Sequence, residues 1–286
     1  MMKKTISQCI IVKNEEKNIR RALSWGKDIM CEQIVVDTGS SDRTVEIARE
    51  MGAKIFFFPW INDFAAAKNF AIDQAKGDWI AFLDADESFT PEDAAKIPEI
   101  LEYVGEDVDG LLTGIVDLDE NNHITGGGTM LRFFVNRPEL RYVGKIHEHL
   151  VRKGESGLHL TDATKQLAFL HTGYQEQEKK DKSKFERNLN IILEILKQEP
   201  ENCDYLGYLG DTYSSDGKNE EARDAYKKAV AAMPEKLEVY DQRSSYTYTN
   251  LLRVSQCLNA PETEVEAIYK EAVEKLPKEP DFDCVM

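Results

Sequence analysis

The sequence predicts an α/β domain with a mostly parallel β-sheet, followed by an all-helical region. Short apolar runs alternate with helix-like runs over about the first 90 residues, strand-like segments continue to about residue 172, and the rest has helical spacing. Short apolar strands that alternate with helices are typical of a parallel sheet covered by helices on both faces. The predicted domains are residues 1–174 and 175–286.

The first domain begins with four strands and three helices in alternation. The strands are predicted at Ile6–Val12, Gln33–Val36, Ala53–Phe58 and Asp78–Leu83, and the helices at Glu16–Trp25, Asp42–Met51 and Asp63–Ala75. Ser41 or Asp42 is predicted to be the N-cap of the second helix, because a side-chain oxygen there can accept a free backbone N–H.

The segment from Asp109 to about Thr172 has a different pattern. Its strands are predicted at Leu111–Leu118, Thr129–Val135, Tyr142–Ile146 and Gln166–His171, and its turns at Asn121–Asn122 and at the three glycines 126–128. This pattern indicates mixed or antiparallel sheet added to the parallel core.

After Tyr174 the spacing is helical. One apolar stripe consists of Phe185, Leu189, Ile192 and Leu196. The pattern of a tetratricopeptide repeat follows at Leu209, Gly210, Tyr213, Ala222, Tyr226, Ala229 and Pro234, with a poorer copy at Leu252, Tyr269, Ala272 and Pro277. Two copies are fewer than a stable solenoid usually needs. The helices therefore either pack on the first domain or belong to a chain that continues beyond Met286.

Composition excludes several classes of protein. The formal net charge is −16, which disfavours general binding of nucleic acid because phosphate backbones are repelled. The five cysteines are scattered and form no CxxC, which argues against a disulfide framework or a zinc cluster. No signal peptide or apolar run of membrane length is found, so a cytoplasmic location is expected.

Acids follow two of the predicted strands. Asp37 ends the second strand, and the fourth strand, in WIAFLDADES, ends in Asp84 and Asp86. Ligands of parallel sheets bind beyond the carboxyl ends of strands, although a single aspartate there is more often a turn or helix cap. Carboxylates at i and i+2 can face one crevice, and Mg²⁺ and Mn²⁺ prefer one or two carboxylates together with substrate phosphates.

These residues carry a resemblance. The stretches IIVKNEEKNIRRAL, IVVDTGSSDRT and FPWINDFAAAKNFAIDQAKGDWIAFLDADE resemble, in order and spacing, the start of a family 2 glycosyltransferase with the Rossmann-like GT-A fold. The later RYVGKIHEHL and LAFLHTGY, before tetratricopeptide-like helices, are similar to a bacterial subgroup that includes sublancin-type peptide S-glycosyltransferases. Some lipopolysaccharide-core glucosyltransferases share the N-terminal motifs and the HE pair.

The resemblance implies a nucleotide pocket. Val12 and Glu15 would line it, and Asp37 would accept a hydrogen bond from the uracil ring. Lys68 would lie near the base or the diphosphate. Taken alone, Lys68 would be interpreted as a solvated surface lysine.

The resemblance also implies a metal and a catalytic base. Asp84 would hold the ribose or a metal-bound water, Asp86 would ligate the metal, and His171 would reach the metal or the diphosphate. Glu148 occupies the place of the family's catalytic carboxylate, where many relatives carry an aspartate after another acid. Here His147 precedes it.

Each of these residues has a plainer interpretation. Glu148 could be a surface acid on a polar edge strand, and His171 could be a core histidine bonded to backbone. Trp60 and Phe64 are predicted to be core residues rather than the floor of a donor pocket.

The implied activity is inverting transfer of a sugar from a UDP-sugar, with Mn²⁺ or Mg²⁺ as cofactor. The acceptor class is a Ser, Thr or Cys side chain of a peptide or protein, or alternatively lipopolysaccharide or a cell-surface polysaccharide. The helical domain could instead form the interface of a homodimer. The non-enzymatic alternative is an interaction scaffold with an inactive first domain. A phosphohydrolase of the haloacid-dehalogenase kind also uses DxD, but after the first strand of its sheet rather than the fourth.

Overall fold

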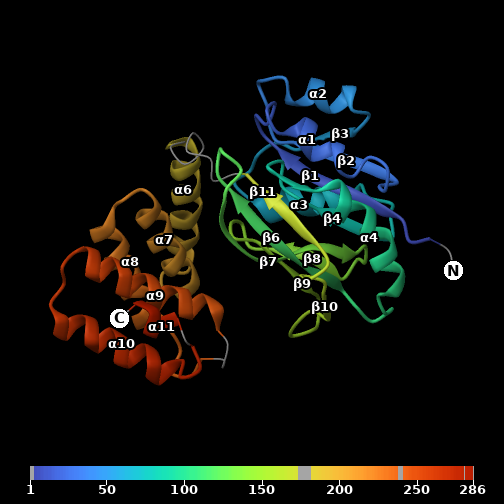
Figure 1. Cartoon of the computed structure of the whole chain (residues 1–286). Coiled ribbons are helices and arrows are strands. Elements are labelled where there is room, and N and C mark those ends of the chain that lie inside the picture. Colours follow the sequence, from blue (N-terminus) through green and yellow to red (C-terminus); the bar gives the residue numbers. More distant parts are fainter. Residues whose placement is uncertain (1–2, 173–181, 238–240, 280, 286) are drawn as a thin grey trace. The chain divides into compact units, whose positions relative to one another are not determined.

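The computed structural model describes residues 3–172, 182–237, 241–279 and 281–285 (Figure 1). The chain divides into two compact units, Met1–Asp181 and Lys182–Met286. The first is an α/β unit and the second is all-helical, which confirms the predicted fold class. The predicted boundary between residues 174 and 175 lies outside the described residues. Among the helices of the described part, none combines the length and the apolar character that a membrane span requires.

The first unit is built on a nine-stranded sheet with the order β3-β2-β1-β4-β7-β6-β11-β5 and with β10 paired to β6. Its strands are β1 (Ile6–Val12), β2 (Glu32–Asp37), β3 (Lys54–Phe57), β4 (Trp79–Phe82), β5 (Glu87–Phe89), β6 (Gly110–Leu118), β7 (Ile124–Val135), β10 (Leu160–Asp162) and β11 (Ala168–His171). β8 (Leu140–Val143) and β9 (His149–Arg152) form a separate antiparallel pair. β1 to β4 are parallel, whereas β7 runs antiparallel to both β4 and β6.

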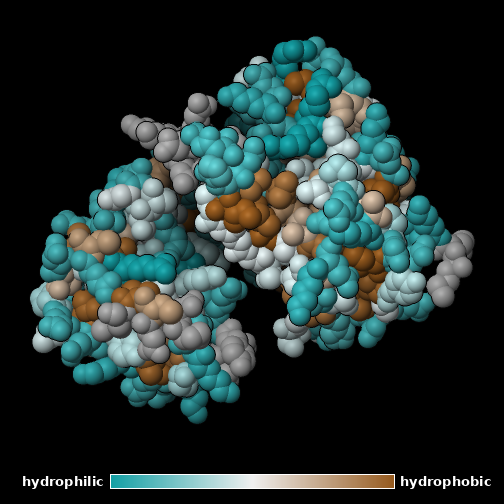
Figure 2. All heavy atoms as spheres, in the orientation of Figure 1, coloured by the Kyte–Doolittle hydropathy of each residue, from teal (hydrophilic) through white to brown (hydrophobic). Residues whose placement is uncertain are grey.

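Helices cover both faces of the parallel strands, as predicted. The helices of this unit are α1 (Ile19–Ser24), α2 (Thr44–Glu50), α3 (Phe64–Asp73) and α4 (Pro91–Tyr103). α1 and α2 pack with Ile10 and Val12 of β1, whereas α3 packs with Cys9 on the other face. The face seen in Figure 2 is largely hydrophilic, with hydrophobic side chains confined to smaller patches.

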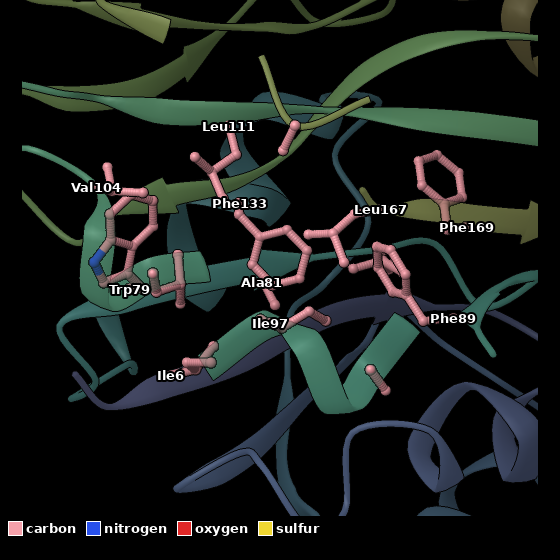
Figure 3. Close-up of a cluster of buried hydrophobic side chains, with 14 residues drawn as sticks. Ile6, Trp79, Ala81, Phe89, Ile97, Val104, Leu111, Phe133, Leu167 and Phe169 are labelled. Carbon is pink, nitrogen blue, oxygen red and sulfur yellow. The ribbon is translucent and has the colours of Figure 1, made fainter. Parts of the chain in front are cut away.

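A further cluster of buried side chains lies between α4 and the antiparallel half of the sheet. Ile97 of α4 lies with Trp79 of β4, Phe133 of β7 and Phe169 of β11 (Figure 3). Neither α4 nor the short strands β5, β9 and β10 were predicted. Strands of three or four residues are stabilised by partners far away in the sequence, which a local pattern does not contain.

The start of α2 differs from the prediction. Its N-cap is Arg43, so the prediction of Ser41 or Asp42 is wrong. Asp42 nevertheless accepts the backbone N–H of Thr44 at 2.9 Å, one residue before the cap position. α3 begins at Phe64, one residue after the predicted start at Asp63, and the side chain of Asp63 caps it by accepting the backbone N–H of Ala66 at 2.8 Å.

The predicted turn at the three glycines is wrong, because Gly126, Gly127 and Gly128 lie within β7. A Cβ atom on Gly127 would lie 2.7 Å from the backbone oxygen of Ile115, so the missing side chain allows β6 and β7 to approach closely. The turn between these strands is at Asn121–Asn122, as predicted, and Asn122 has a left-handed φ of 61°.

This geometry predicts that a side chain is tolerated less well at Gly127 than at the neighbouring Gly128. We expect Gly127→Ala to lower the free energy of unfolding by about 1–3 kcal/mol, because backbone must move to admit the methyl group. Gly128→Ala is the matched control, since a Cβ there would lie 3.6 Å from a side-chain carbon of Ile115. Urea unfolding of both variants measures the difference, and equal stabilities would contradict the close approach.

The second unit consists of consecutive helices that pack on one another. They are α6 (Lys182–Gln198), α7 (Cys203–Ser215), α8 (Asn219–Ala232), α9 (Gln242–Cys257), α10 (Glu262–Lys275) and α11 (Asp281–Val285). α7 and α8 approach closely at Gly210, where a Cβ atom would lie 2.4 Å from the ring of Tyr226. Ala222, Tyr226 and Ala229 are buried, as are Leu252 and Ala272 of the poorer copy. The assignment of these helices to the tetratricopeptide family stays a prediction.

Candidate active site

The predicted site residues of the parallel strands meet at one edge of the sheet. Val12 and Asp37 are partners in the register of β1 and β2, and both end their strands. β4 runs parallel to β1 on its other side, and Ala85, between the two aspartates of DxD, packs in one buried cluster with Val12. The DxD turn therefore begins where the sheet changes from parallel to antiparallel, between β4 and β7.

Asp37 shapes the turn after β2. Its buried carboxylate accepts the backbone N–H groups of Gly39 and Ser40, each at 3.1 Å. The carbonyl of Val12 accepts the backbone N–H of Thr38 at 2.9 Å, which fixes the two strand ends to each other. The predicted contact of Asp37 with a uracil ring stays a prediction.

Glu15 lies in the loop between β1 and α1, and this loop is next to the start of α2 in space. Its backbone N–H donates to the hydroxyl of Thr44 at 2.7 Å, and its carboxylate accepts from the side-chain amide of Asn18 at 2.9 Å. These contacts hold the loop against the start of α2, and the predicted role of Glu15 in a nucleotide pocket stays a prediction.

Lys68 is buried rather than solvated, so its plainer interpretation is wrong. Its Nζ lies 2.7 Å from Oε1 of Glu148 and 4.0 Å from Oδ1 of Asp84. The rings of Phe82 and Tyr142 lie 5.2 Å and 4.9 Å from the same nitrogen. Burial favours the neutral amine, but the charges of Asp84 and Glu148 outweigh it and raise the pKa of Lys68 above its ordinary value. Lys68 thus brings together three predicted residues from three segments.

Glu148 lies in the loop between β8 and β9 rather than on an edge strand. The loop reverses through Gly144 and His147, with φ values of 91° and 53°. Its Lys145 carbonyl accepts the backbone N–H of Phe64 at 2.8 Å, which ties the loop to the first turn of α3. The side chain of Glu148 is 13% exposed, so it reaches solvent while it is paired with Lys68.

Trp60 and Phe64 lie just before Lys68 in the chain. Both are half-buried and contact each other edge-on with their ring centres 4.8 Å apart. Neither belongs to the buried core, so that prediction is wrong.

Two residues of the site, Arg132 and Glu87, were not predicted. Nη2 of Arg132 lies 3.1 Å from Oδ2 of Asp84 and also contacts Oε1 of Glu87. The other oxygen of Glu87 accepts the backbone N–H of Asp84 at 3.0 Å. Glu87 directly follows DxD and could have been noticed there, whereas the only signal for Arg132 is a single charge within the apolar run MLRFFV.

The acids of this cluster titrate differently. Burial raises the pKa of Glu87 to about 7, against the charge of Arg132. Burial acts on Asp84 in the same direction, but Lys68 and Arg132 outweigh it and lower the pKa of Asp84. Asp84 therefore remains ionised at neutral pH.

Asp86 faces His171. Oδ2 of Asp86 lies 3.5 Å from Nε2 of His171, whose Nδ1 lies 2.8 Å from Oδ1 of Asp117, a residue that was not predicted. Burial opposes a charge on His171, but its hydrogen bonds with Asp86 and Asp117 outweigh burial and raise its pKa to about 9. Thr172 donates its backbone N–H to the carbonyl of Asp86 at 3.1 Å, which holds the end of β11 beside the DxD turn.

Asp86 and His171 could supply two donors to a metal, His171 only after it loses the proton that its raised pKa retains. Within the ranges that the structure describes, no three His, Cys, Asp or Glu side chains come together as a metal site. A carboxylate and an imidazole nitrogen side by side nevertheless fit a cation that takes its remaining ligands from substrate phosphates and water, as Mg²⁺ and Mn²⁺ usually do. They do not make an all-protein cage.

A comparison with protein families decides what this domain is. The family model described as Glycosyl transferase family 2 matches residues 7–151, just over half of the chain. The chain belongs to this family. Membership of the family, together with the observed strand order, confirms the predicted GT-A fold.

Curated relatives match beyond this domain. The chain is 33% identical over 231 residues to Glycosyltransferase SunS of Bacillus phage SPbeta, which covers 79% of this chain and 53% of that protein. It is 31% identical over 218 residues to a TPR repeat-containing protein of Synechococcus elongatus, which covers 74% of this chain and 53% of that protein. The chain thus spans about half the length of these relatives.

Among solved structures, the chain is similar to glucosyl-3-phosphoglycerate synthase from Mycobacterium tuberculosis. That protein was solved with Mn²⁺, UDP and glucosyl-3-phosphoglycerate. The identity is 22%, the match covers 41% of this chain and 44% of that one, and the TM-score is 0.32. Similarity this low transfers no residue roles.

The pairing of Lys68 makes a prediction about stability. Removing one partner of a buried ion pair leaves an uncompensated charge, which lowers the free energy of unfolding by roughly 3–5 kcal/mol. We expect Lys68→Met to lower the free energy of unfolding by about 3 kcal/mol, the lower end of that range, because the Asp84 side chain is 43% exposed.

Adding Glu148→Gln to Lys68→Met should restore part of the loss, which urea unfolding measures. Arg43→Met is the control, since Arg43 pairs with Glu46 in solvent and its removal should change nothing measurable. Equal stability of the Lys68→Met variant and the wild type would show that the ion pair contributes nothing.

Proposed function

We propose that this chain is a glycosyltransferase that moves a sugar from a UDP-sugar to an acceptor with inversion of the anomeric centre, dependent on a divalent cation. The observation that carries the proposal is the contact of Lys68 with both Asp84 and Glu148. This contact puts the predicted base beside the DxD turn of a family 2 domain.

The donor is assigned to the edge formed by β1, β2 and β4. Asp37, Val12 and Glu15 are the residues proposed for the uridine. The adjoining part of the site holds two buried cations, Lys68 and Arg132, which are already paired with Asp84, Glu87 and Glu148, so a diphosphate is proposed to enter together with a divalent cation.

The cation is assigned to Asp86 and His171, whose donor atoms lie 3.5 Å apart. When bound, Mn²⁺ or Mg²⁺ would neutralise charge on the departing diphosphate. Asp84 is proposed to hold the ribose or a water of the cation, because Lys68 and Arg132 keep it ionised and oriented.

Glu148 is the proposed base. The acceptor hydroxyl or thiol must lose its proton as it attacks, and a positioned carboxylate that takes the proton contributes typically ~10²–10⁴-fold to the rate. Inversion in one displacement needs one such base and no enzymic nucleophile. The pair with Lys68 holds the Glu148 carboxylate in one position, and its partial exposure leaves room for an acceptor.

The acceptor is proposed to be a Ser, Thr or Cys side chain of a peptide or protein. The similarity to Glycosyltransferase SunS over 79% of this chain supports transferase activity, and it extends into the helical unit. Helical repeats cradle extended chains in many proteins. A saccharide acceptor is the alternative, and mass spectrometry of candidate peptides and saccharides offered with several UDP-sugars distinguishes the two.

Metal-dependent donor binding tests the first step. UDP with Mn²⁺ should stabilise the wild type by RT ln(1 + [L]/Kd), about 2.7 kcal/mol at 100 Kd. Asp86→Ala removes one of two protein donors, so its thermal shift with UDP and Mn²⁺ should vanish while its melting temperature without ligand stays close to that of the wild type.

Asp73→Ala is the control for this assay, since that aspartate is 56% exposed at the end of α3, where it forms an ion pair with Arg141. An unchanged shift in Asp86→Ala would refute the metal role, and a wild type without any shift would favour the scaffold alternative.

Glu148→Gln tests the base. We expect this variant to bind UDP and Mn²⁺ as the wild type does and to lose transfer by at least about 10²-fold, because an amide cannot take the acceptor proton. Single-turnover transfer from a labelled UDP-sugar measures the rate, with the exposed Glu155→Gln as the control. A rate near that of the wild type would place the base elsewhere.

A further inference from the structure

Arg132 lies outside every motif that the family resemblance uses. It is 7% exposed, and its guanidinium carbon lies 5.5 Å from the ring centre of Phe169. In the register of the antiparallel pair, Ala81 of β4 is opposite Phe133 of β7. Arg132 is therefore the next residue of β7, beside the point where β4 ends and the DxD turn begins.

The guanidinium closes a ring of hydrogen bonds around this turn. Arg132 donates to Oδ2 of Asp84 at 3.1 Å and to Oε1 of Glu87. Glu87 accepts the backbone N–H of Asp84 at 3.0 Å through its other oxygen, and its own backbone N–H donates to the Asp84 carbonyl at 3.1 Å. The carboxylate, the backbone N–H and the carbonyl of Asp84 are thus all hydrogen-bonded, and these bonds determine the orientation of the turn.

The same ring connects the turn to the other half of the candidate metal site. Glu87 begins β5, and its partner in the antiparallel register of β5 and β11 is His171. Fixing Glu87 therefore fixes the strand that carries His171, while fixing Asp84 fixes the turn that carries Asp86. The planar fork of the arginine guanidinium has several N–H donors and can bond two carboxylates at once. The ammonium group of a lysine cannot do so with the same geometry.

We propose that Arg132 is a positioning residue, which holds the DxD turn and β5 so that Asp86 and His171 face each other across a cation. The inference rests on the proposed function, because it concerns the same cation. Arg132 would not itself be a ligand of the cation. It acts through Asp84 and Glu87.

The test compares Arg132→Lys and Arg132→Met with the wild type. Changing groups that orient metal ligands typically costs 10–100-fold in metal affinity. We expect both variants to raise the Kd for Mn²⁺ in the presence of UDP by about 10-fold or more, Arg132→Lys included, because its charge is retained but its fork is lost. Free Mn²⁺ measured by electron paramagnetic resonance gives the Kd without requiring an acceptor or turnover.

Arg137→Lys is the matched control. Arg137 also pairs with a buried acid of the same unit, with Nη1 3.4 Å from Oδ1 of Asp109, a side chain that is 1% exposed. This substitution makes the same chemical change to an arginine that is paired with a buried acid away from the DxD turn, so it should leave the Kd for Mn²⁺ unchanged. A general loss of stability would affect both positions, whereas a positioning role affects only Arg132.

The outcomes separate this inference from the proposed function. Arg132 variants that are folded by near-ultraviolet circular dichroism and bind Mn²⁺ as tightly as the wild type would overturn the positioning role and leave the proposed function intact. A wild type that binds neither Mn²⁺ nor UDP would overturn both. If Arg132→Met does not fold, Arg132→Lys and Glu87→Gln decide the question, since each keeps a hydrogen-bonding side chain of similar size.

Discussion

Asp84 lies between two buried cations, and the geometry of the candidate site depends on this arrangement. Lys68 comes from α3 and Arg132 from β7, and neither could be buried without an acid, because an unpaired buried charge costs several kcal/mol. Each cation also contacts a second acid, Lys68 with Glu148 and Arg132 with Glu87. One carboxylate thereby connects a helix, two strands and the loop that carries the proposed base.

The sheet explains why these residues converge. β4 runs parallel to β1 on one side and antiparallel to β7 on the other, so the chain leaves β4 at the border between the parallel and the antiparallel half of the sheet. The parallel half contributes strand ends and the start of α3. The antiparallel half contributes side chains from within β7 and β11, namely Arg132 and His171. A ligand bound at this border would contact groups from both halves, as is general for ligands of open α/β sheets.

The sequence predicted the parallel half well, because each of its strands is a short apolar run beside an amphipathic helix. Asp84 and Asp86 were found from their place at a strand end, whereas Lys68, Glu148 and His171 came from the family resemblance. Arg132, Glu87 and Asp117 were missed because their partners lie 45 to 54 positions away in the sequence or are set by a turn that no pattern marks. The glycines of β7 were misread because glycine suits a turn and a close strand pair equally well.

The charges of the cluster bear on what it binds. Lys68 and Arg132 supply two positive charges to Asp84, Glu87 and Glu148, and Asp86 lies next to them in the chain. Burial raises the pKa of Glu87 to about 7 against the charge of Arg132, and the two cations are fewer than the four acids around them. A bare diphosphate would add negative charge to this balance, whereas a diphosphate that arrives with a divalent cation adds little. Under the proposed function, Asp86 and His171 would hold a cation whose charge would allow this pocket to accept its donor.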